Sequence, residues 1–220
     1  TFSEGVNDFS VADVTVVGGT KAGNFATGAD GDTVYTLVVT PDASSTTNMT
    51  VDVAAGVATD LAGNDNTAAT QSVQSVDTTA PSVDVTMDDS ELNIGDTSTV
   101  TFTFSEAPVG FVLADDVSAE NGTVTGLTAT ADPLVFTATF TPSANIEDTT
   151  NVISVGTGYT DASGNTGTGD DSANYEVDTI APSVGITDNT AGTATGPVTY
   201  TFTFSEGVND FSVADVTVVG

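Results

Sequence analysis

The chain has 220 residues and a formal net charge of −30, because 31 Asp and Glu residues face a single basic residue, Lys21. This balance excludes nucleic acids and anionic membranes as partners, since both require clustered Lys and Arg, and it favours divalent cations. The chain has no Cys and no His, which excludes disulfides, the usual zinc sites, Cys nucleophiles and His general bases. We also expect no membrane insertion, since no apolar run approaches the roughly 18 residues of a span.

One sequence pattern occurs three times along the chain. Its recurring segments are TFSE at Thr1, Thr103 and Thr203, TDxxGN at Thr59 and Thr160, and VDTxAPSV at Val76 and Val177. The steps between copies are 100 to 102 residues, and a unit of that size is a domain rather than one turn of a solenoid. The hydrophobic content of 38 % is enough for folded cores.

The first eighteen residues, TFSEGVNDFSVADVTVVG, are repeated without change at 203–220. Because a repeat is already under way at Thr1, we expect the chain to be a piece of a longer array. On this hypothesis the sequence continues beyond Gly220 with GTKAGNF, as it does after Gly18.

The domain boundaries are predicted at two proline-containing segments, 77–81 and 178–182. Proline lacks a backbone donor and holds the residue before it extended, so both segments are interpreted as short, taut linkers. We therefore expect three domains. Residues 1–77 form a first domain without its opening strands, residues 78–178 a complete domain, and residues 179–220 the beginning of a third.

Strands are predicted by an alternation of apolar and polar residues in the complete domain. Val100, Phe102 and Phe104 alternate with Thr, as expected of a strand with one buried and one solvated face. The predicted strands, in chain order, are 82–87, 99–105, two less clearly defined strands between 111 and 130, then 135–141, 151–159 and 173–177. No segment shows a sustained helical stripe. The fold class is therefore all-β, with tandem immunoglobulin-like β-sandwiches joined end to end.

A family resemblance rests on motifs that follow one another in a fixed order. The motifs are VTFTFSE, GFxxxD, NGT, FTATFTP, TDxSGN and VDTxAP. Together they resemble the bacterial Ig-like repeats of giant secreted adhesins of the biofilm-associated type, over the whole chain. The resemblance implies extracellular arrays that extend a ligand-binding tip away from the cell surface. The first domain departs from the pattern at Ala58, where the complete domain has Tyr159.

Carboxylates from distant positions are predicted to converge at one end of the complete domain. Glu106 follows a strand that returns to the end where the domain begins. The loop 161–165 must lie at the same end, because the strand after it has to leave by the opposite end. Asp77, in the preceding linker, enters there as well.

Calcium is the expected ligand of this cluster, because Ca²⁺ takes six to eight oxygen ligands in irregular geometry. Asp77, Glu106 and Asp161 would supply charge, and Asn165 a neutral oxygen. The equivalent predicted ligands are Glu4, Asp60 and Asn64 in the first domain, and Asp178 and Glu206 for the third. The alternative is ordinary turn chemistry, in which Asp and Asn side chains bind their own backbone.

The predicted function is that of extender or spacer repeats of an extracellular, cell-surface adhesin, stiffened by calcium at the domain junctions, in cell adhesion or biofilm formation. A self-assembling module of a surface layer or filament is the alternative. The expected partners are calcium, neighbouring repeats and other copies of the chain. A glycan-binding role is disfavoured by the absence of Trp and Arg, and ice binding by the irregular spacing of the Thr residues. An enzyme is not expected, since a catalytic pair would recur in every repeat.

Overall fold

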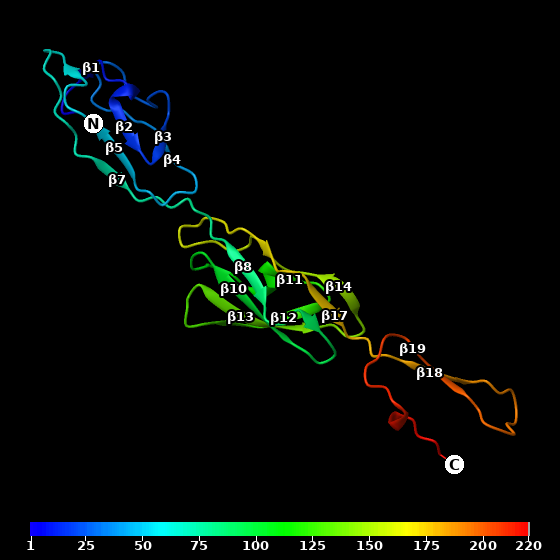
Figure 1. Ribbon diagram of the computed structural model, residues 1–220. Coiled ribbons are helices and arrows are strands. Elements are labelled where there is room, and N and C mark those ends of the chain that lie inside the picture. Colours follow the sequence, from blue (N-terminus) through cyan, green and yellow to red (C-terminus); the bar gives the residue numbers. More distant parts are fainter. Residues whose placement is uncertain (220) are drawn as a thin grey trace.

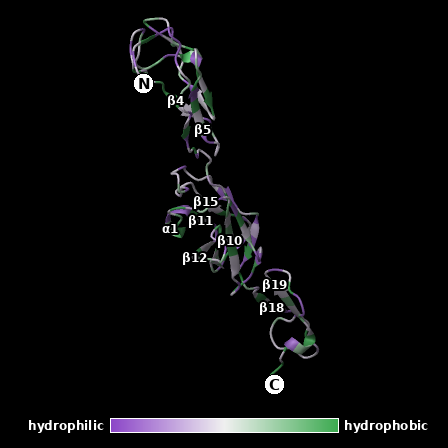
Figure 2. Cartoon of the chain, turned by 90° about the vertical axis from the view of Figure 1, so that its left-hand side faces the viewer, coloured by the Kyte–Doolittle hydropathy of each residue, from purple (hydrophilic) through white to green (hydrophobic). Residues whose placement is uncertain are grey.

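The computed structural model describes residues 1–219. The strands form three groups in a row, and the two ends of the chain lie at opposite ends of an elongated molecule (Figure 1). We call these groups the first unit (β1–β7), the middle unit (β8–β17) and the third unit (β18, β19 and the 3-10 helix that follows). Hydrophobic and hydrophilic residues both occur along the strands (Figure 2), and most of the buried apolar residues lie in the middle unit.

The middle unit is built from three sheets. The largest has the order β12-β13-β10-β8, and its strands are β8 (Val83–Met87), β10 (Ser98–Phe104), β12 (Gly122–Ala129) and β13 (Val135–Pro142). A second has the order β11-β15-β16, with β11 (Val117–Ala119), β15 (Ile153–Val155) and β16 (Asp170–Asp171). The third has the order β14-β17-β9, with β14 (Glu147–Asn151), β17 (Tyr175–Asp178) and β9 (Glu91–Leu92). All pairs are antiparallel except β9 with β17.

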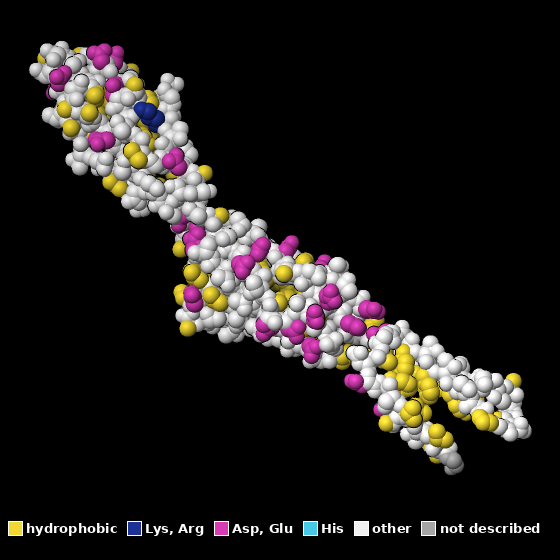
Figure 3. Space-filling model, in the orientation of Figure 1, with side chains coloured by type: hydrophobic (Ala, Val, Ile, Leu, Met, Phe, Trp, Pro, Cys, Tyr) yellow, Lys and Arg dark blue, Asp and Glu magenta, His cyan; other side chains and the backbone are white. Residues whose placement is uncertain are grey.

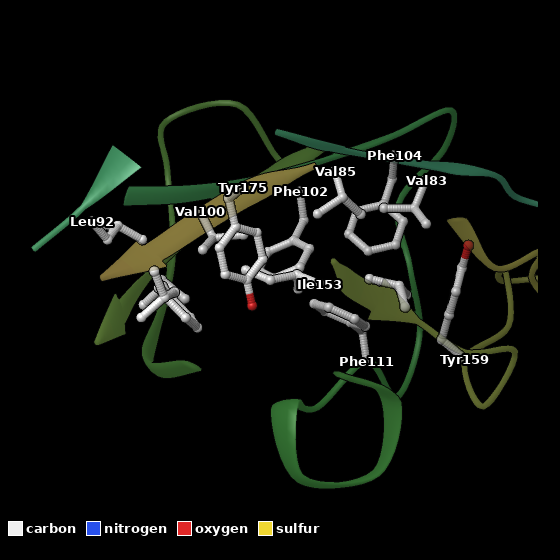
Figure 4. Close-up of a cluster of buried hydrophobic side chains, with 14 residues drawn as sticks. Val83, Val85, Leu92, Val100, Phe102, Phe104, Phe111, Ile153, Tyr159 and Tyr175 are labelled. Atoms are coloured by element: carbon white, nitrogen blue, oxygen red, sulfur yellow. The ribbon is translucent and has the colours of Figure 1, made fainter. Parts of the chain in front are cut away.

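The core of the middle unit lies between these sheets. Val100, Phe102 and Phe104 of β10 are 0 %, 0 % and 2 % exposed, so the apolar half of the alternating pattern is buried, as predicted. Aromatic rings meet edge to face around Phe111, whose centroid is 5.3 Å from that of Phe102 and 5.0 Å from that of Phe104. Figure 4 shows these side chains directed toward one another. The all-β fold class is confirmed.

Several local features of the middle unit differ from the predictions, and the short strands β9, β14 and β16 were not expected. The strand expected over 151–159 is reduced to the three residues of β15, and the strand before it, β14, ends at Asn151, where the predicted strand was to begin. The buried Asn151 amide donates to the carbonyl of Tyr175 at 3.0 Å, and after Asn151 the chain passes from the sheet of β14 and β17 to the sheet of β11, β15 and β16. A short helix, α1 (Leu113–Asp116), was also not expected. The Asp116 carboxylate closes it by accepting from the backbone N–H of Val112 at 2.7 Å.

The first unit has a similar succession of elements from the TFSE segment onward, with one strand, β5, where the middle unit has β14 and β15. Its strands are β1 (Val6–Asn7), β2 (Val14–Val17), β3 (Gly19–Lys21), β4 (Val39–Pro41), β5 (Met49–Val53), β6 (Thr59–Asp60) and β7 (Ser72–Gln74), with a 3-10 helix at Val11–Asp13. Its buried apolar residues are Val6, Val14 and Ala58, far fewer than in the middle unit. A cavity of about 760 Å³ is lined by its remaining apolar side chains together with polar ones, Glu4, Asp60 and Asp65 among them.

The third unit is a β-hairpin followed by a 3-10 helix at Val213–Asp215. The hairpin pairs β18 (Val184–Asp188) with β19 (Tyr200–Phe204). Phe211 packs on it, with its ring centroid 4.9 Å from that of Phe204. Hydrophobic side chains gather in the hollow between the hairpin and the segment that follows β19 (Figure 3).

Candidate metal site at the domain junction

The linker between the first two units is held by its threonine to the unit before it. Thr78 Oγ1 donates to the carbonyl of Asp42 at 2.7 Å and accepts from the backbone N–H of Ser45 at 3.0 Å. The backbone N–H of Thr78 donates to the carbonyl of Ser45, also at 3.0 Å. The start of the linker is therefore fixed to the first unit by three hydrogen bonds.

The residue before this threonine is held by the unit that follows. Asp77 accepts a hydrogen bond at Oδ2 from Ser163 Oγ at 2.9 Å, and its carbonyl accepts one from Asn165 Nδ2 at 3.2 Å. Both partners lie in the loop that carries the TDxxGN motif. Adjacent linker residues thus bind in opposite directions, one to each unit.

Three carboxylates meet where the linker reaches the middle unit. Asp77, Glu106 and Asp161 each offer a carboxylate oxygen, and these three oxygens all lie within 4.8 Å of one another. Asp161 is 3 % exposed, and the other two are half-buried. The sequence predicted that these residues would lie together, and the structure brings them together from positions 77, 106 and 161.

The TDxxGN loop folds around the carboxylate of its own aspartate. Asp161 Oδ1 accepts from the backbone N–H groups of Ser163 and Asn165 at 2.8 and 2.9 Å, and Oδ2 accepts from Asn165 Nδ2 at 2.7 Å. Gly164 has a φ of 91°, in the left-handed region that glycine enters without steric cost. Burial opposes ionisation of Asp161, but the hydrogen bonds from Asn165, Ser163 and Gly164 outweigh it and lower the pKa. Asp161 is therefore a preformed anion.

Glu106 has the opposite electrostatic environment. Burial raises the pKa of its carboxyl, and the negative charges of Asp161 and Asp77 raise it further. No Lys or Arg side chain balances the cluster, because the one basic residue of the chain, Lys21, donates to backbone carbonyls of the first unit. The three acids therefore repel one another in the absence of a cation.

The donor set fits a hard divalent cation. Two oxygens bound to one Ca²⁺ at about 2.4 Å can be at most about 4.8 Å apart, and the three carboxylate oxygens meet that limit. All side-chain donors are oxygens, which suits Ca²⁺ better than a soft metal. Asn165 was predicted to supply a neutral oxygen, but the atom that it directs to Asp161 is the amide nitrogen Nδ2, which is a donor. In this arrangement Asn165 positions Asp77 and Asp161.

The other predicted ligands lie at equivalent places, but each set has fewer acids. In the first unit Asp60 accepts hydrogen bonds like those of Asp161. Its Oδ1 accepts from the backbone N–H groups of Ala62 and Asn64, and its Oδ2 accepts from Asn64 Nδ2 at 2.7 Å. Glu4 is exposed. Hydrogen bonding by Asn64 is the main cause that lowers the pKa of Asp60. Among the described residues the triad at Asp77 is the only group of three acids placed to share an ion.

At the second junction, Asp178 and Glu206 lie where the linker meets the third unit. Asp178 is exposed and accepts from the backbone N–H of Ile180 at 3.1 Å, as Asp77 accepts from Thr79 at 3.2 Å. Residues 179–219 contain no TDxxGN loop. Within the described chain this junction therefore shows two of the three acids.

Two groups of contact residues were not predicted from the sequence. Thr179 repeats the role of Thr78, donating from Oγ1 to the carbonyl of Ser143 at 2.7 Å and accepting from the N–H of Ile146 at 2.9 Å. The Asp-Thr pair in both linkers was the available signal. Ser163 had no such signal, because the first unit has Ala62 at its position.

Comparisons with known proteins agree with the repeat structure. Residues 1–76 and residues 77–177 each match the bacterial Ig-like domain family, a structural family typical of surface and secreted proteins, and no catalytic domain is matched. Searches of curated proteins and of solved structures gave no significant match. None of the helices within residues 1–219 is long and apolar enough to cross a membrane. The two consecutive matches cover most of the chain and confirm tandem Ig-like domains, and the chain therefore belongs to the bacterial Ig-like domain family.

Proposed function

We propose that the chain is a set of extender repeats from an extracellular bacterial adhesin, and that calcium at the domain junctions stiffens the repeats into a rod for cell adhesion or biofilm formation. The observation that carries this proposal is the triad of Asp77, Glu106 and Asp161, whose oxygens lie within 4.8 Å of one another across a linker. The family and the end-to-end arrangement of units support the spacer role.

The junction explains why a cation would act on shape. Asp77 belongs to the linker, whereas Glu106 and Asp161 belong to the middle unit. Without a cation their mutual repulsion pushes Asp77 away from the middle unit, and the contacts that Ser163 and Asn165 make with Asp77 oppose it. The end of the linker is held separately, since the carbonyl of Pro81 accepts from the backbone N–H of Thr168 at 2.9 Å. A bound Ca²⁺ turns this repulsion into attraction, since each carboxylate then faces a charge of opposite sign. The angle between the units becomes fixed.

Small-angle X-ray scattering of the chain, in calcium and in EGTA, tests this function. We expect the distribution of interatomic distances to broaden and the maximum dimension to change when calcium is removed. Glu106→Gln should give the EGTA profile in both conditions, whereas Glu176→Gln, at an exposed position of β17, should respond as the parent chain does. An unchanged maximum dimension, with and without calcium, would overturn the proposal. Dilute samples keep association between chains out of the measurement.

A further inference from the structure

A groove opens on the middle unit between the edges of two of its sheets. β12 is an edge strand of the four-stranded sheet, and β11 is an edge strand of the sheet β11-β15-β16. α1 lies beside both strands (Figure 2). The groove has a volume of about 220 Å³, and the residues that line it are Leu113, Val117, Ala119, Gly122, Thr123 and Val124. Its lining is mainly apolar, and none of these residues belongs to the candidate metal site.

In the first unit a lysine stands at the corresponding place. β3 pairs with β4 so that Lys21 lies opposite Val39, and β12 pairs with β13 so that Val124 lies opposite Phe140. Val39 and Phe140 occupy the same position when the repeats are aligned. Because the two strand pairs have the same register, Lys21 is the counterpart of Val124.

The ammonium group of this lysine is bound by the backbone of its own unit. Lys21 Nζ donates to the carbonyl of Val11, in the 3-10 helix, at 2.6 Å. It also donates to the carbonyl of Val14, at the start of β2, at 2.5 Å. The side chain thus ties β3 to the helical turn that precedes β2.

The middle unit has the same two acceptor positions but no lysine. The backbone N–H of Val14 closes the 3-10 helix by donating to the carbonyl of Val11. In the same way the backbone N–H of Val117 closes α1 by donating to the carbonyl of Leu113. Leu113 and Val117 therefore stand in the places of the two acceptors, and both line the groove. Val124 stands in the place of the lysine and offers no donor to their carbonyl groups.

The lysine of the first unit also acts on a carboxylate in the same turn. Asp13 Oδ2 accepts from the backbone N–H of Ser10 at 2.8 Å. Hydrogen bonds from Ser10 are the main cause that lowers the pKa of Asp13, and the positive charge of Lys21 lowers it further. In the first unit, therefore, a cation balances the carboxylate of the helical turn.

The corresponding carboxylate of the middle unit has no such cation. Asp116 caps α1 as Asp13 caps the 3-10 helix, and it directly precedes Val117. It is 4 % exposed, and its Oδ1 has no hydrogen-bond partner among the described residues. Because Oδ1 lies against Gly158, a cation in the groove would act on Asp116 through its charge rather than through a hydrogen bond.

We propose that this groove is a docking site for a lysine side chain of a partner protein. The stem of the lysine packs along Val117 and Val124, and its Nζ donates to the carbonyl groups of Leu113 and Val117, in the manner of Lys21 in the first unit. Since the groove lies between edge strands, an exposed lysine reaches it without breaking any hydrogen bond of the sheets.

The chemistry of the place selects a lysine of another protein. An ammonium group is a compact charge on a flexible apolar stem, whereas the guanidinium of arginine is a planar fork that suits carboxylates and phosphates. The net charge of −30 attracts cationic partners. The one lysine of the 220 residues, Lys21, is already bound within the first unit. The occupant of the groove is therefore supplied by a partner.

Nuclear magnetic resonance of the isotope-labelled 220-residue chain tests this site. The probe is a Gly-Lys-Gly peptide with capped ends, added in EGTA at about 0.15 M salt, where attraction over long distances is screened. We expect the amide signals of Leu113, Val117 and Val124 to shift and to saturate as one site. The same peptide with norleucine, which has the stem without the ammonium group, should leave them unchanged. A peptide with arginine should shift them less.

Two substitutions in β12 separate filling of the groove from the addition of charge. Val124→Lys places a lysine in the groove and should weaken binding of the peptide at least about tenfold. Thr125→Lys adds the same charge on the opposite, exposed face of β12 and should bind as the parent does. In the first unit Lys21→Val should open the equivalent groove, so that shifts at Val11 and Val14 appear as a second site.

Three outcomes would overturn the proposal. They are the absence of shifts with the lysine peptide, equal shifts with the norleucine or arginine peptides, and binding that survives Val124→Lys. Circular dichroism of Val124→Lys should match that of the parent, which shows that a loss of binding is not a loss of fold. The second site gained in Lys21→Val does not depend on that variant. The calcium site is tested apart from this groove, because the peptide is added in EGTA.

Discussion

Ser163 Oγ donates a hydrogen bond to Oδ2 of Asp77 at 2.9 Å, across 86 positions of sequence. The bond joins a loop of the middle unit to the linker that precedes that unit. It places Asp77 beside Asp161, so that the linker contributes one of the three acids of the candidate site. The shape of the junction and the affinity of the site for a cation are therefore coupled, because both depend on where Asp77 lies.

Glu106→Gln should weaken calcium binding about tenfold, which corresponds to about 1.4 kcal/mol. The substitution preserves size but removes one of the three charges that attract the cation. Isothermal titration calorimetry measures the change, and Glu176→Gln serves as the control because Glu176 is exposed on β17. Equal affinities for the two variants would show that Glu106 is not a ligand.

Acid should remove the stabilisation that calcium gives to the middle unit. The pKa of Glu106 is raised, first by burial and then by Asp161 and Asp77, so protons compete with the cation as the pH falls through that raised value. Without calcium the effect of Glu106 on the pH dependence of stability has the opposite sign. Protonated Glu106 then stabilises the folded state below its ordinary pKa, and this contribution is lost as the pH rises through the raised value.

Thermal unfolding against pH, with calcium and with EGTA, measures both effects. Asp161 acts in the opposite sense to Glu106 because its pKa is lowered. Its contribution is present above its ordinary pKa and is lost as the pH falls through the lowered value. Glu106→Gln should remove the part of the pH dependence of stability that lies above the ordinary glutamate pKa, while the part due to Asp161 remains. A pH profile unaffected by Glu106→Gln would contradict the assignment.

Thr179→Val should destabilise the middle unit by about 1 kcal/mol, because it removes the hydrogen bonds that the hydroxyl makes with two part-buried backbone groups. Thr179 is 6 % exposed, and its hydroxyl bonds to the carbonyl of Ser143 and the N–H of Ile146. Urea denaturation of the full chain gives the change for the middle-unit transition. Thr179→Ser keeps the hydroxyl and should retain most of the stability; an equal loss in both variants would point to the methyl group instead.

Phe140→Ala should cost the middle unit about 3–5 kcal/mol, the usual effect of removing a buried phenyl ring. Phe140 is 0 % exposed and packs edge to face on Tyr175, with centroids 5.0 Å apart. Val39→Ala, at the equivalent position of the first unit, should cost less than about 1 kcal/mol, since Val39 is only half-buried beside the cavity. Two resolved transitions in calorimetry would separate the units. Similar losses would mean that the first unit is as well packed as the middle one.

Alkaline unfolding of the middle unit should follow the ionisation of Tyr175. Burial and the nearby charge of Glu120 raise the pKa of Tyr175 to about 12, and its hydroxyl donates to the carbonyl of Glu120. The stability due to this group is complete below the ordinary tyrosine pKa and is lost as the pH rises through about 12. Tyrosinate absorbance and circular dichroism should change together there. In Tyr175→Phe the unfolding should move to higher pH; an unaltered midpoint would exclude Tyr175 as its cause.

The fold was predictable because the physical signals were local or repeated. Strands such as β10 follow from the alternation of Val100, Phe102 and Phe104 with Thr, and the unit length follows from the repeat itself. The division between β14 and β15 was not predictable. The chain passes there from the sheet of β14 and β17 to the sheet of β11, β15 and β16. This change depends on partners that are distant in the sequence and leaves no periodic pattern in it.

The candidate site was predictable in outline, because strand directions alone bring Asp77, Glu106 and Asp161 to one end of the unit. The part played by Ser163 and Thr78 depends on side-chain reach across the junction, 2.9 Å from Ser163 Oγ to Asp77 and 2.7 Å from Thr78 Oγ1 to the carbonyl of Asp42. Sequence spacing carries no information on such distances. The direction of the Asn165 amide is likewise set by the carboxylate it meets.

The parallel pairing of β9 with β17 has a mechanical consequence. Tension along the chain pulls the start of the middle unit backward and its end, at Asp178, forward. Because β9 and β17 run in the same direction, with Leu92 opposite Val177, this tension shears the two strands past each other instead of peeling them apart one bond at a time. The hydrogen bonds between them, including that from the N–H of Glu176 to the carbonyl of Ser90 at 2.8 Å, must then rupture together. In a unit that is joined to its neighbours at both ends, the pairing of β9 with β17 would thus resist pulling forces along the chain.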